Sequence, residues 1–180
     1  MDIIKSEKFR NYFLYFVMYS VIGWIYEVFL EVVIYRWGFS NRGLLFGPYC
    51  PIYGVGAIVL ILTVYRLIEN KDRKTKLKML IPVFLGSALI ATAIELVATY
   101  ICEYTIGYWP WQTYADYKIN FQARIALSPS IRFGLGGVLF LYVIQPVFEL
   151  IVNKMNNRKK ALLFFTLLTV IIVDIIFYII

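Results

Sequence analysis

Five acidic side chains lie within or at the ends of long apolar stretches of this sequence, where a charge is costly to bury. They are Glu27, Glu31, Glu95, Glu103 and Asp174. A charged side chain at the centre of a membrane span costs roughly 2.5–3.5 kcal/mol on insertion scales, so it normally faces the interior of a helix bundle and marks a functional site. Helical spacing places Glu27 and Glu31 on one face of a first helix, and Glu95 on one face of a second with Thr99.

Three arginines flank the same stretches and can balance these charges: Arg42, Arg124 and Arg132. Arginine offers a planar fork that suits a carboxylate. We therefore expect the acids and arginines to form a ligand-binding or ion-binding site in the outer half of the bundle. In this hypothesis Glu27 and Glu95 coordinate an ion or carry a proton. Arg42 and Arg124 neutralise these two acids when the site is empty.

The alternative interpretation is that the same groups are internal Glu–Arg pairs that fix the register of the helices and bind nothing. Glu31 lies one helical turn closer to the end of its apolar stretch than Glu27. Its long side chain can therefore also extend its carboxylate to the membrane interface. Both interpretations stay open from the residues alone.

The stretch from Asn41 to Gly56 is too rich in glycine and proline to form one continuous helix. It holds four glycines, two prolines, one arginine and no acid within sixteen residues. Glycine permits backbone angles that other residues resist, and proline lacks an N–H donor. We expect a re-entrant or partly unwound segment, then a helix with Pro51 in its first turn; the alternative is a tight turn outside the membrane. The expected pocket lining from this stretch is Gly43, Gly47, Pro48, Pro51, Tyr53 and Gly54.

The elements that carry these residues are predicted to be membrane-spanning helices. Of the 180 residues, 61% are hydrophobic and only 16% are charged, and the mean hydropathy is +0.73. A soluble domain is closer to about 25% charged, and several apolar runs here reach the roughly 20 residues that cross a bilayer. We predict an all-α, polytopic transmembrane helix bundle that forms a single integral-membrane domain. The expected spans are about 11–37, 51–67, 78–102, 129–153 and 161–180.

Local signals and a weak internal repeat refine this architecture. Ser128 and Pro129 are typical of a helix N-cap followed by a proline in the first turn, and Pro146 predicts a kink in the same helix. Each half of the chain contains an apolar helix with a carboxylate, then an arginine, then a glycine-rich helix. This order predicts two parallel repeats of a helix pair, followed by one C-terminal helix.

Lysines and arginines predict how the spans are oriented. Three lie before the first span, six between the second and third, and four between the fourth and fifth. The connections on the opposite side hold Arg36, Arg42, Lys118, Arg124 and Arg132. The positive-inside rule therefore predicts a cytoplasmic N-terminus and an external C-terminus. We expect the protein to reside in the plasma (cell) membrane. The net charge of +7 then reflects contact with anionic membrane lipids, and we expect no nucleic-acid partner.

The longest connection, residues 104–132, is rich in aromatic side chains. Those of its first half are Tyr108, Trp109, Trp111, Tyr114 and Tyr117. Aromatic residues in this position are most often an interfacial belt, which is the interpretation we favour. The alternative is a lid whose rings line the mouth of the polar site and bind an apolar or cationic ligand.

Several chemistries are excluded or disfavoured by the composition. The chain has no histidine, which removes the usual metal ligand and the base of Ser-His and Cys-His pairs, so we assign no metal, no cofactor and no catalytic residue. It also lacks the glycine-rich phosphate loop that ends in Gly-Lys-Ser/Thr, so it does not hydrolyse ATP itself. Cys50 and Cys102 are expected to be two unrelated buried thiols rather than a disulfide.

Two runs of residues resemble a known family of membrane proteins. The first is Gly23-Trp-Ile-Tyr-Glu27 followed by Asn41-Arg-Gly-Leu-Leu-Phe-Gly-Pro-Tyr-Cys-Pro-Ile-Tyr-Gly54, and the second is Glu95, Glu103, Gly107, Trp111, Tyr114, Asn120-Phe-Gln-Ala-Arg124-Ile and Phe133-Gly134. They resemble the CmpB-like family of type IV ABC-transporter permeases, to which animal multi-span proteins of unknown function are related. The resemblance covers about residues 11–150, and Ala123 stands where the family pattern has glycine.

The resemblance implies a permease subunit, and the residues are consistent with a small transport component that carries a Glu/Arg site. Such a subunit would need an ATPase partner on its basic cytoplasmic loops, or a homo-oligomer to complete a pathway. Two other classes stay open. One is a membrane enzyme that acts on a lipid headgroup, which the missing nucleophile makes the weaker hypothesis. The other is a non-transporting accessory or scaffold protein.

Overall fold

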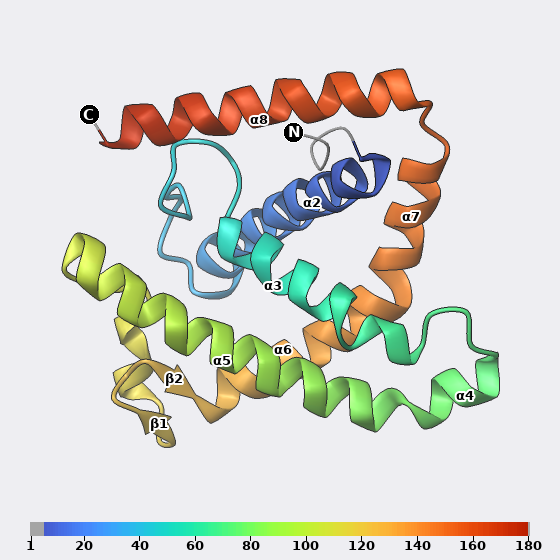
Figure 1. Ribbon diagram of the computed structural model, residues 1–180. Coiled ribbons are helices and arrows are strands. Elements are labelled where there is room, and N and C mark those ends of the chain that lie inside the picture. The colour runs from blue at the N-terminus through green and yellow to red at the C-terminus, as the bar shows by residue number, and fades with distance from the viewer. Residues whose placement is uncertain (1–5, 180) are drawn as a thin grey trace. The chain divides into compact units, whose positions relative to one another are not determined.

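The computed structural model describes residues 6–179 and is built almost entirely of helices (Figure 1). Within these residues, four helices are long and apolar enough to cross a membrane, and a shorter apolar helix covers Pro51–Leu67. The four long helices are Glu7–Ile34, Leu80–Ile106, Leu127–Asn153 and Asn157–Ile179. Together with the shorter helix they correspond one to one with the predicted spans. The prediction of an all-α membrane helix bundle is confirmed.

The contacts divide the chain into two compact units, which are described separately. Unit 1 combines the residues up to 58 with those from 147 onward, and unit 2 comprises residues 59–146. The boundaries fall within helix α3 (Pro51–Leu62) and helix α7 (Gln145–Asn153). That residues 1–180 form one membrane domain stays a prediction.

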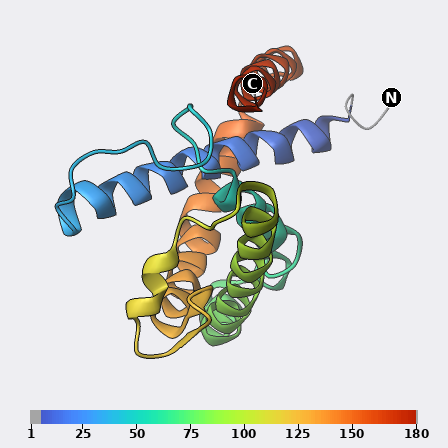
Figure 2. The same ribbon diagram turned by 90° about the vertical axis from the view of Figure 1, so that its left-hand side faces the viewer.

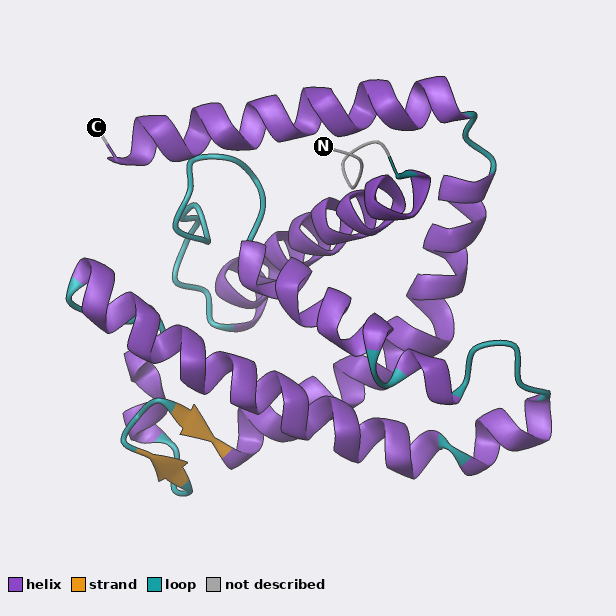
Figure 3. Cartoon of the chain, in the orientation of Figure 1, coloured by secondary structure: helices purple, strands orange, loops and turns teal. Residues whose placement is uncertain are grey.

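Unit 1 begins with helix α2 (Glu7–Phe29), which continues as the π-helix η1 (Leu30–Ile34). The helix ends before the predicted Trp37 because Arg36 and Gly38 adopt positive φ angles of 56° and 93°, which interrupt helical backbone. A loop then leads to α3, which starts at Pro51 as predicted. Figure 3 shows this loop in teal. Helix α7 and helix α8 (Asn157–Ile179) complete the unit.

Helices α2 and α8 pack through an aromatic cluster and an ion pair whose lysine is buried. Phe164 is almost fully buried, and its ring centroid lies 5.9 Å from that of Phe9 and 4.7 Å from that of Phe13. Lys160, also buried, places its Nζ 2.7 Å from a carboxylate oxygen of Glu7. Because the ammonium group of Lys160 is paired with Glu7, it can be buried in an otherwise apolar helix contact.

Glycines let α2 and α3 approach closely. A Cβ atom added to Gly54 would lie 2.6 Å from the carbonyl oxygen of Phe16 and would also overlap Ser20. One added to Gly23 would overlap the ring of Tyr53. Real Cβ atoms are not found this close to other atoms, so only glycine fits at these two positions. Small residues at helix contacts are a common packing device in membranes.

Unit 2 is built around the pair of helices α5 (Leu80–Ile106) and α6 (Leu127–Leu139). They lie side by side in both ribbon views (Figures 1 and 2). Their contact again depends on glycine, because a Cβ added to Gly134 would lie 2.6 Å from the ring of Phe84. One added to Gly137 would overlap Ser87. Thr92 Oγ1 also donates a hydrogen bond of 2.7 Å to Ser130 Oγ across this contact.

Short elements fill the connections of unit 2. The 3₁₀-helix η2 (Tyr65–Leu67) and helix α4 (Arg73–Lys78) precede α5. Asp72 caps α4 by accepting hydrogen bonds from the backbone N–H groups of Lys74 and Thr75, and bonds from Thr75 lower the pKa of its carboxyl. Between α5 and α6 lie the 3₁₀-helix η3 (Gln112–Asp116) and a two-stranded antiparallel ribbon, β1 (Asn120–Phe121) and β2 (Ile125–Ala126).

The start of α6 corrects one prediction. Ser128 is not the N-cap: the helix begins at Leu127 and is preceded by Ala126, which has no side-chain cap. Strand β2 runs directly into the helix, so its last residue takes the cap position. Near the predicted kink, the π-helix η4 (Phe140–Ile144) precedes Pro146. Proline has no backbone N–H, so the helical hydrogen bond to the carbonyl one turn earlier is missing. The π-helical turn accommodates this missing bond, which is why the irregularity lies about one turn before the proline.

Candidate functional site

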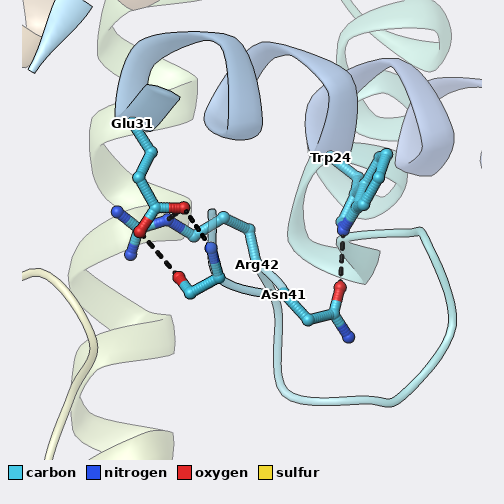
Figure 4. Close-up of polar contacts among 5 residues, drawn as sticks. Trp24, Glu31, Asn41 and Arg42 are labelled. Carbon is cyan, nitrogen blue, oxygen red and sulfur yellow. Dashed lines mark hydrogen bonds and ion pairs between the residues drawn. The ribbon is translucent and has the colours of Figure 1, made fainter. Parts of the chain in front are cut away.

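In unit 1, Glu31 accepts three polar contacts from the loop that follows its helix (Figure 4). Its carboxylate accepts hydrogen bonds from Ser40 Oγ at 2.6 Å and Ser40 N at 3.2 Å, and it lies 3.1 Å from Arg42 Nε. The Glu31 side chain is only 7% exposed, whereas that of Arg42 is 31% exposed. The returning loop therefore covers the carboxylate of Glu31, and its position at the membrane interface stays a prediction.

The loop is held in place by Trp24 and Asn41. Trp24 Nε1 donates a hydrogen bond of 2.7 Å to Asn41 Oδ1 (Figure 4). Asn41 Nδ2 donates in turn to the carbonyl oxygens of Leu45 and Phe46, at 3.1 and 2.9 Å. Gly43 has a φ of 108°, and a Cβ there would lie 2.9 Å from the carbonyl oxygen of Tyr49. The predicted non-helical segment is thus a folded loop with its own hydrogen bonds.

Glu27 has a different partner from the one expected. Its carboxylate accepts a hydrogen bond from the hydroxyl of Tyr53 on α3. The expectation that Arg42 neutralises Glu27 is wrong, because Arg42 pairs with Glu31. Glu31 lies one turn closer to the loop that carries Arg42, so it is the acid this arginine reaches. Tyr53, predicted only as pocket lining, thus contacts a predicted site acid.

Asp174 on α8 binds the glycine–proline part of the same loop. Its Oδ1 accepts a hydrogen bond of 3.1 Å from Phe46 N, and its Oδ2 accepts one of 2.9 Å from Gly47 N and another from the Tyr49 hydroxyl. A groove of about 700 Å³ adjoins these groups. It is lined by Phe46, Gly47, Thr169, Val170, Val173, Asp174 and Phe177. Pro48 and Pro51, which flank Tyr49 and Cys50, are not among its lining residues.

In unit 2, Arg124 is enclosed by aromatic rings. Its Nη2 lies 2.6 Å from a carboxylate oxygen of Glu103. The guanidinium carbon lies 4.3 Å from the ring centroid of Tyr100 and 4.4 Å from that of Trp109, within the range of cation–π contacts. Two indoles hold the backbone beneath it: Trp109 Nε1 donates to the carbonyl of Ala123 at 3.1 Å, and Trp111 Nε1 donates to that of Arg124 at 3.0 Å.

Arg124 forms its ion pair with Glu103, whereas the sequence analysis had assigned it to Glu95. The buried carboxylate of Glu95 accepts a hydrogen bond of 2.7 Å from the hydroxyl of Tyr114. Arg132 Nη2 donates to the Tyr117 hydroxyl at 2.8 Å. Rings of the long connection therefore contact predicted site residues of unit 2, and whether they form a belt or a lid stays a prediction.

Within each unit the predicted site acids have different partners, as Glu27 and Glu31 show in unit 1 and Glu95 and Glu103 in unit 2. Residues 6–179 contain no group of three or more histidine, cysteine, aspartate or glutamate side chains that could hold a metal ion. Cys50 and Cys102 are both free and buried, as expected. Ser40 and Tyr49 were not predicted as site residues, and Tyr114 was expected only as one ring of an interfacial belt or of a lid. Their hydroxyl groups have no fixed spacing to the acids that would have indicated them.

These features define a polytopic α-helical membrane protein in which most of the predicted site acids bind the connections that follow their helices or lie beside them. Comparison with protein families places it more closely: residues 14–179 match the model of the family described as "Putative ABC-transporter type IV". The chain belongs to this family. The match extends to the C-terminal helix, beyond the region that carries the resemblance in the sequence. Searches of curated proteins and of solved structures found no match.

Proposed function

We propose that this protein is a small permease-like subunit of an ABC-type transporter, with a Glu/Arg polar site in the outer half of its bundle. The observation that carries the proposal is the pairing of acids inside apolar helices: Glu31 with Arg42, and Glu103 with Arg124. Ionisable groups in membrane spans generally mark substrate or ion pathways. Because the chain belongs to a family described as an ABC transporter, we infer that these ionisable groups act in transport.

The acids divide into two chemical kinds, which suggests different roles. Glu31 and Glu103 are paired with arginine, so their charge is balanced and they position the loops. Glu27 and Glu95 accept hydrogen bonds from the neutral hydroxyls of Tyr53 and Tyr114. These two acids, each bound by a tyrosine hydroxyl, are the groups that we propose to bind an ion or carry a proton. Arg132, held by Tyr117, belongs to the rim of the same proposed site.

The proposed orientation follows from charge. The N-terminus lies in the cytoplasm, the C-terminus outside, and the protein resides in the plasma membrane. Helix α4, with Arg73, Lys74, Lys76 and Lys78, then faces the cytoplasm together with the basic turn before α8. These surfaces would contact anionic lipids and an ATPase subunit, and a homo-oligomer is the other route to a complete pathway. No role in binding nucleic acid and no catalytic residue is proposed.

The first test is a gentle affinity purification from native membranes, followed by mass spectrometry of everything that copurifies. The proposal predicts an ATPase subunit at near-stoichiometric amounts, and ATP-driven flux after reconstitution of the complex into liposomes. Recovery of the protein alone, or with lipid only, would argue against a permease subunit. Formation of a product from labelled lipid would instead favour the membrane enzyme.

The site is tested in the same liposomes by Glu27→Gln and Glu95→Gln, with the exposed loop acid Glu69 changed to Gln as the matched control. We expect each site variant to lose at least about tenfold in flux, as is typical for groups that transfer a proton, and the control to be unaffected. Full flux in both site variants would remove Glu27 and Glu95 from the mechanism. A loss of folding instead of flux would support the scaffold role.

A further inference from the structure

Asp174 is the one predicted site acid on the C-terminal helix, and its charge is not balanced by an arginine or lysine. Its partners are two backbone N–H groups and the hydroxyl of Tyr49. No described lysine or arginine forms an ion pair with it. Three neutral donors hold the carboxylate in place but leave its negative charge uncompensated. An uncompensated charge inside an apolar helix calls for a cationic partner.

The carboxylate also retains room for one more donor. An ionised carboxylate has about four lone-pair positions, two on each oxygen. Oδ2 accepts from Gly47 N and the Tyr49 hydroxyl, whereas Oδ1 accepts only from Phe46 N. One position on Oδ1 is therefore available. The three existing bonds fix the carboxylate, so an additional donor would meet an acceptor that is already oriented.

The space beside this carboxylate has the size and lining of a site for an apolar ligand. The groove of about 700 Å³ includes Asp174 among its lining residues, and its walls are formed mainly by Val170, Val173, Phe46 and Phe177. Ligand pockets are typically about 300–1,000 Å³ with mostly apolar walls and few polar groups. Phe46 and Phe177 remain 68% and 69% exposed, so each ring keeps surface that a ligand can contact, although Phe46 also lies against the ring of Tyr178. Aromatic faces attract cations.

We propose that this groove binds a lipophilic organic cation, with its ammonium group on Asp174 and its apolar body between Phe46 and Phe177. The complementarity is one of charge: an apolar groove with a single fixed negative group selects against neutral and anionic molecules of the same shape. The assignment of this cation as the transported substrate rests on the proposed function. The binding site itself does not, because it is complete within unit 1.

The test measures binding to the purified full-length protein in phosphatidylcholine nanodiscs. The probe is dansylcadaverine, a fluorescent primary ammonium, and the matched neutral probe is its N-acetyl derivative. Empty nanodiscs supply the background. Fluorescence anisotropy should show the cation binding at least about tenfold more tightly than the neutral probe, in line with a cation–carboxylate contact that is partly removed from water. Equal affinities would overturn the proposal.

Three variants locate the site. Asp174→Asn should abolish the preference for the cation, and Val170→Trp, which fills the groove but keeps the carboxylate, should weaken binding of both probes. Tyr49→Phe removes one hydrogen bond but keeps the charge, so it should preserve the preference. Thermal unfolding shows whether each variant is folded. If Asp174→Asn does not fold, the binding measured with Val170→Trp tests whether the groove is the binding site. Unchanged binding in a folded Val170→Trp protein would place the cation elsewhere.

Two further outcomes separate this inference from the proposed function. Displacement of the probe by phosphatidylethanolamine at ordinary membrane content, with no effect of free ammonium compounds, would make the groove a lipid site and overturn the proposal. Cation binding without a copurifying ATPase would support the groove and count against the permease. If the protein forms an ATPase complex that transports another substrate and the groove binds no cation, the permease proposal is supported and the cation site is overturned.

Discussion

The two units each hold an arginine–glutamate pair, but they bury opposite members of it. In unit 1 the Glu31 side chain is 7% exposed and Arg42 is 31% exposed, whereas in unit 2 Arg124 is 11% exposed and Glu103 is 43% exposed. Glu31 is covered by hydrogen-bond donors of a loop, and Arg124 by two aromatic faces. The groups that surround each buried charge therefore match its sign. Amides and hydroxyls donate hydrogen bonds to the anion, and aromatic rings attract the cation.

The largest expected effect comes from removing the buried cation. Arg124→Ala deletes the stacking on Tyr100 and Trp109 and leaves a gap between the two rings. We expect a loss of about 3 kcal/mol in the free energy of unfolding, from two cation–π contacts and the lost packing of the side chain. Denaturant unfolding in detergent, followed by tryptophan fluorescence, measures it.

The matched control for Arg124 is Arg132→Ala in the same unit. Arg132 is exposed, and its guanidinium carbon lies 5.7 Å from the Tyr117 ring centroid. Its removal should cost less than about 1 kcal/mol, as for exposed cation–π contacts. Equal losses in the two variants would contradict the view that the aromatic enclosure of Arg124 is what matters.

The glycine contacts test whether both units depend on close helix approach. Gly54→Ala in unit 1 and Gly137→Ala in unit 2 place a Cβ into the facing helix, and each should cost about 1–3 kcal/mol through overpacking. Gly56 and Gly136 are matched controls, because nothing lies within 4 Å of an added Cβ. Alanine there should stabilise the helix by about 0.5–1 kcal/mol. Thermal unfolding of the four variants measures these changes in stability. A loss of stability at the control positions would show that the glycines are needed for backbone freedom and not for close helix contact.

The opposite burial of the two pairs predicts an asymmetry in unit 1. Arg42→Ala leaves the buried Glu31 without a cation and should cost about 2 kcal/mol, less than the full cost of breaking a buried pair because Ser40 still donates two hydrogen bonds. Glu31→Gln, which keeps an acceptor for Ser40 and leaves an arginine that can reach solvent, should cost about 1 kcal/mol or less. A larger loss of unfolding free energy for Glu31→Gln than for Arg42→Ala would contradict the view that the buried member of this pair is the glutamate.

The sequence predicted the spans well because hydropathy and length report directly on burial in a bilayer. It could not predict which acid each arginine meets. Glu27 and Glu31 are one turn apart on the same face, so the choice depends on the path of the loop, which the hydrogen bonds of Asn41 help to fix. Glu95 and Glu103 are likewise both within α5, and Arg124 reaches the second because two indoles hold its backbone.

The internal repeat stays a prediction, and the two units support it unequally. Both join an acid-bearing helix to a glycine-packed helix through a connection that carries an arginine. The connections differ, because that of unit 1 is an irregular loop and that of unit 2 contains a β-ribbon (Figure 3). The shared part is therefore the helix packing and the Glu–Arg pair, and the connections account for the different cover of the buried charge.

The smallest expected effect lies in the turn that presents Arg124. Gln122 and Ala123 have φ angles of 52° and 54°, in the left-handed region that side chains with a Cβ disfavour. Ala123→Gly should therefore stabilise unit 2 by up to about 1 kcal/mol, since the left-handed conformation costs roughly 1–2 kcal/mol per residue, partly offset by the greater freedom of glycine in the unfolded chain. Ala126→Gly in strand β2, where the backbone is extended with a φ of −145°, is the matched control and should destabilise. If both substitutions lowered the unfolding midpoint, the turn would not be strained, and the hold on Arg124 would come from the two indoles alone.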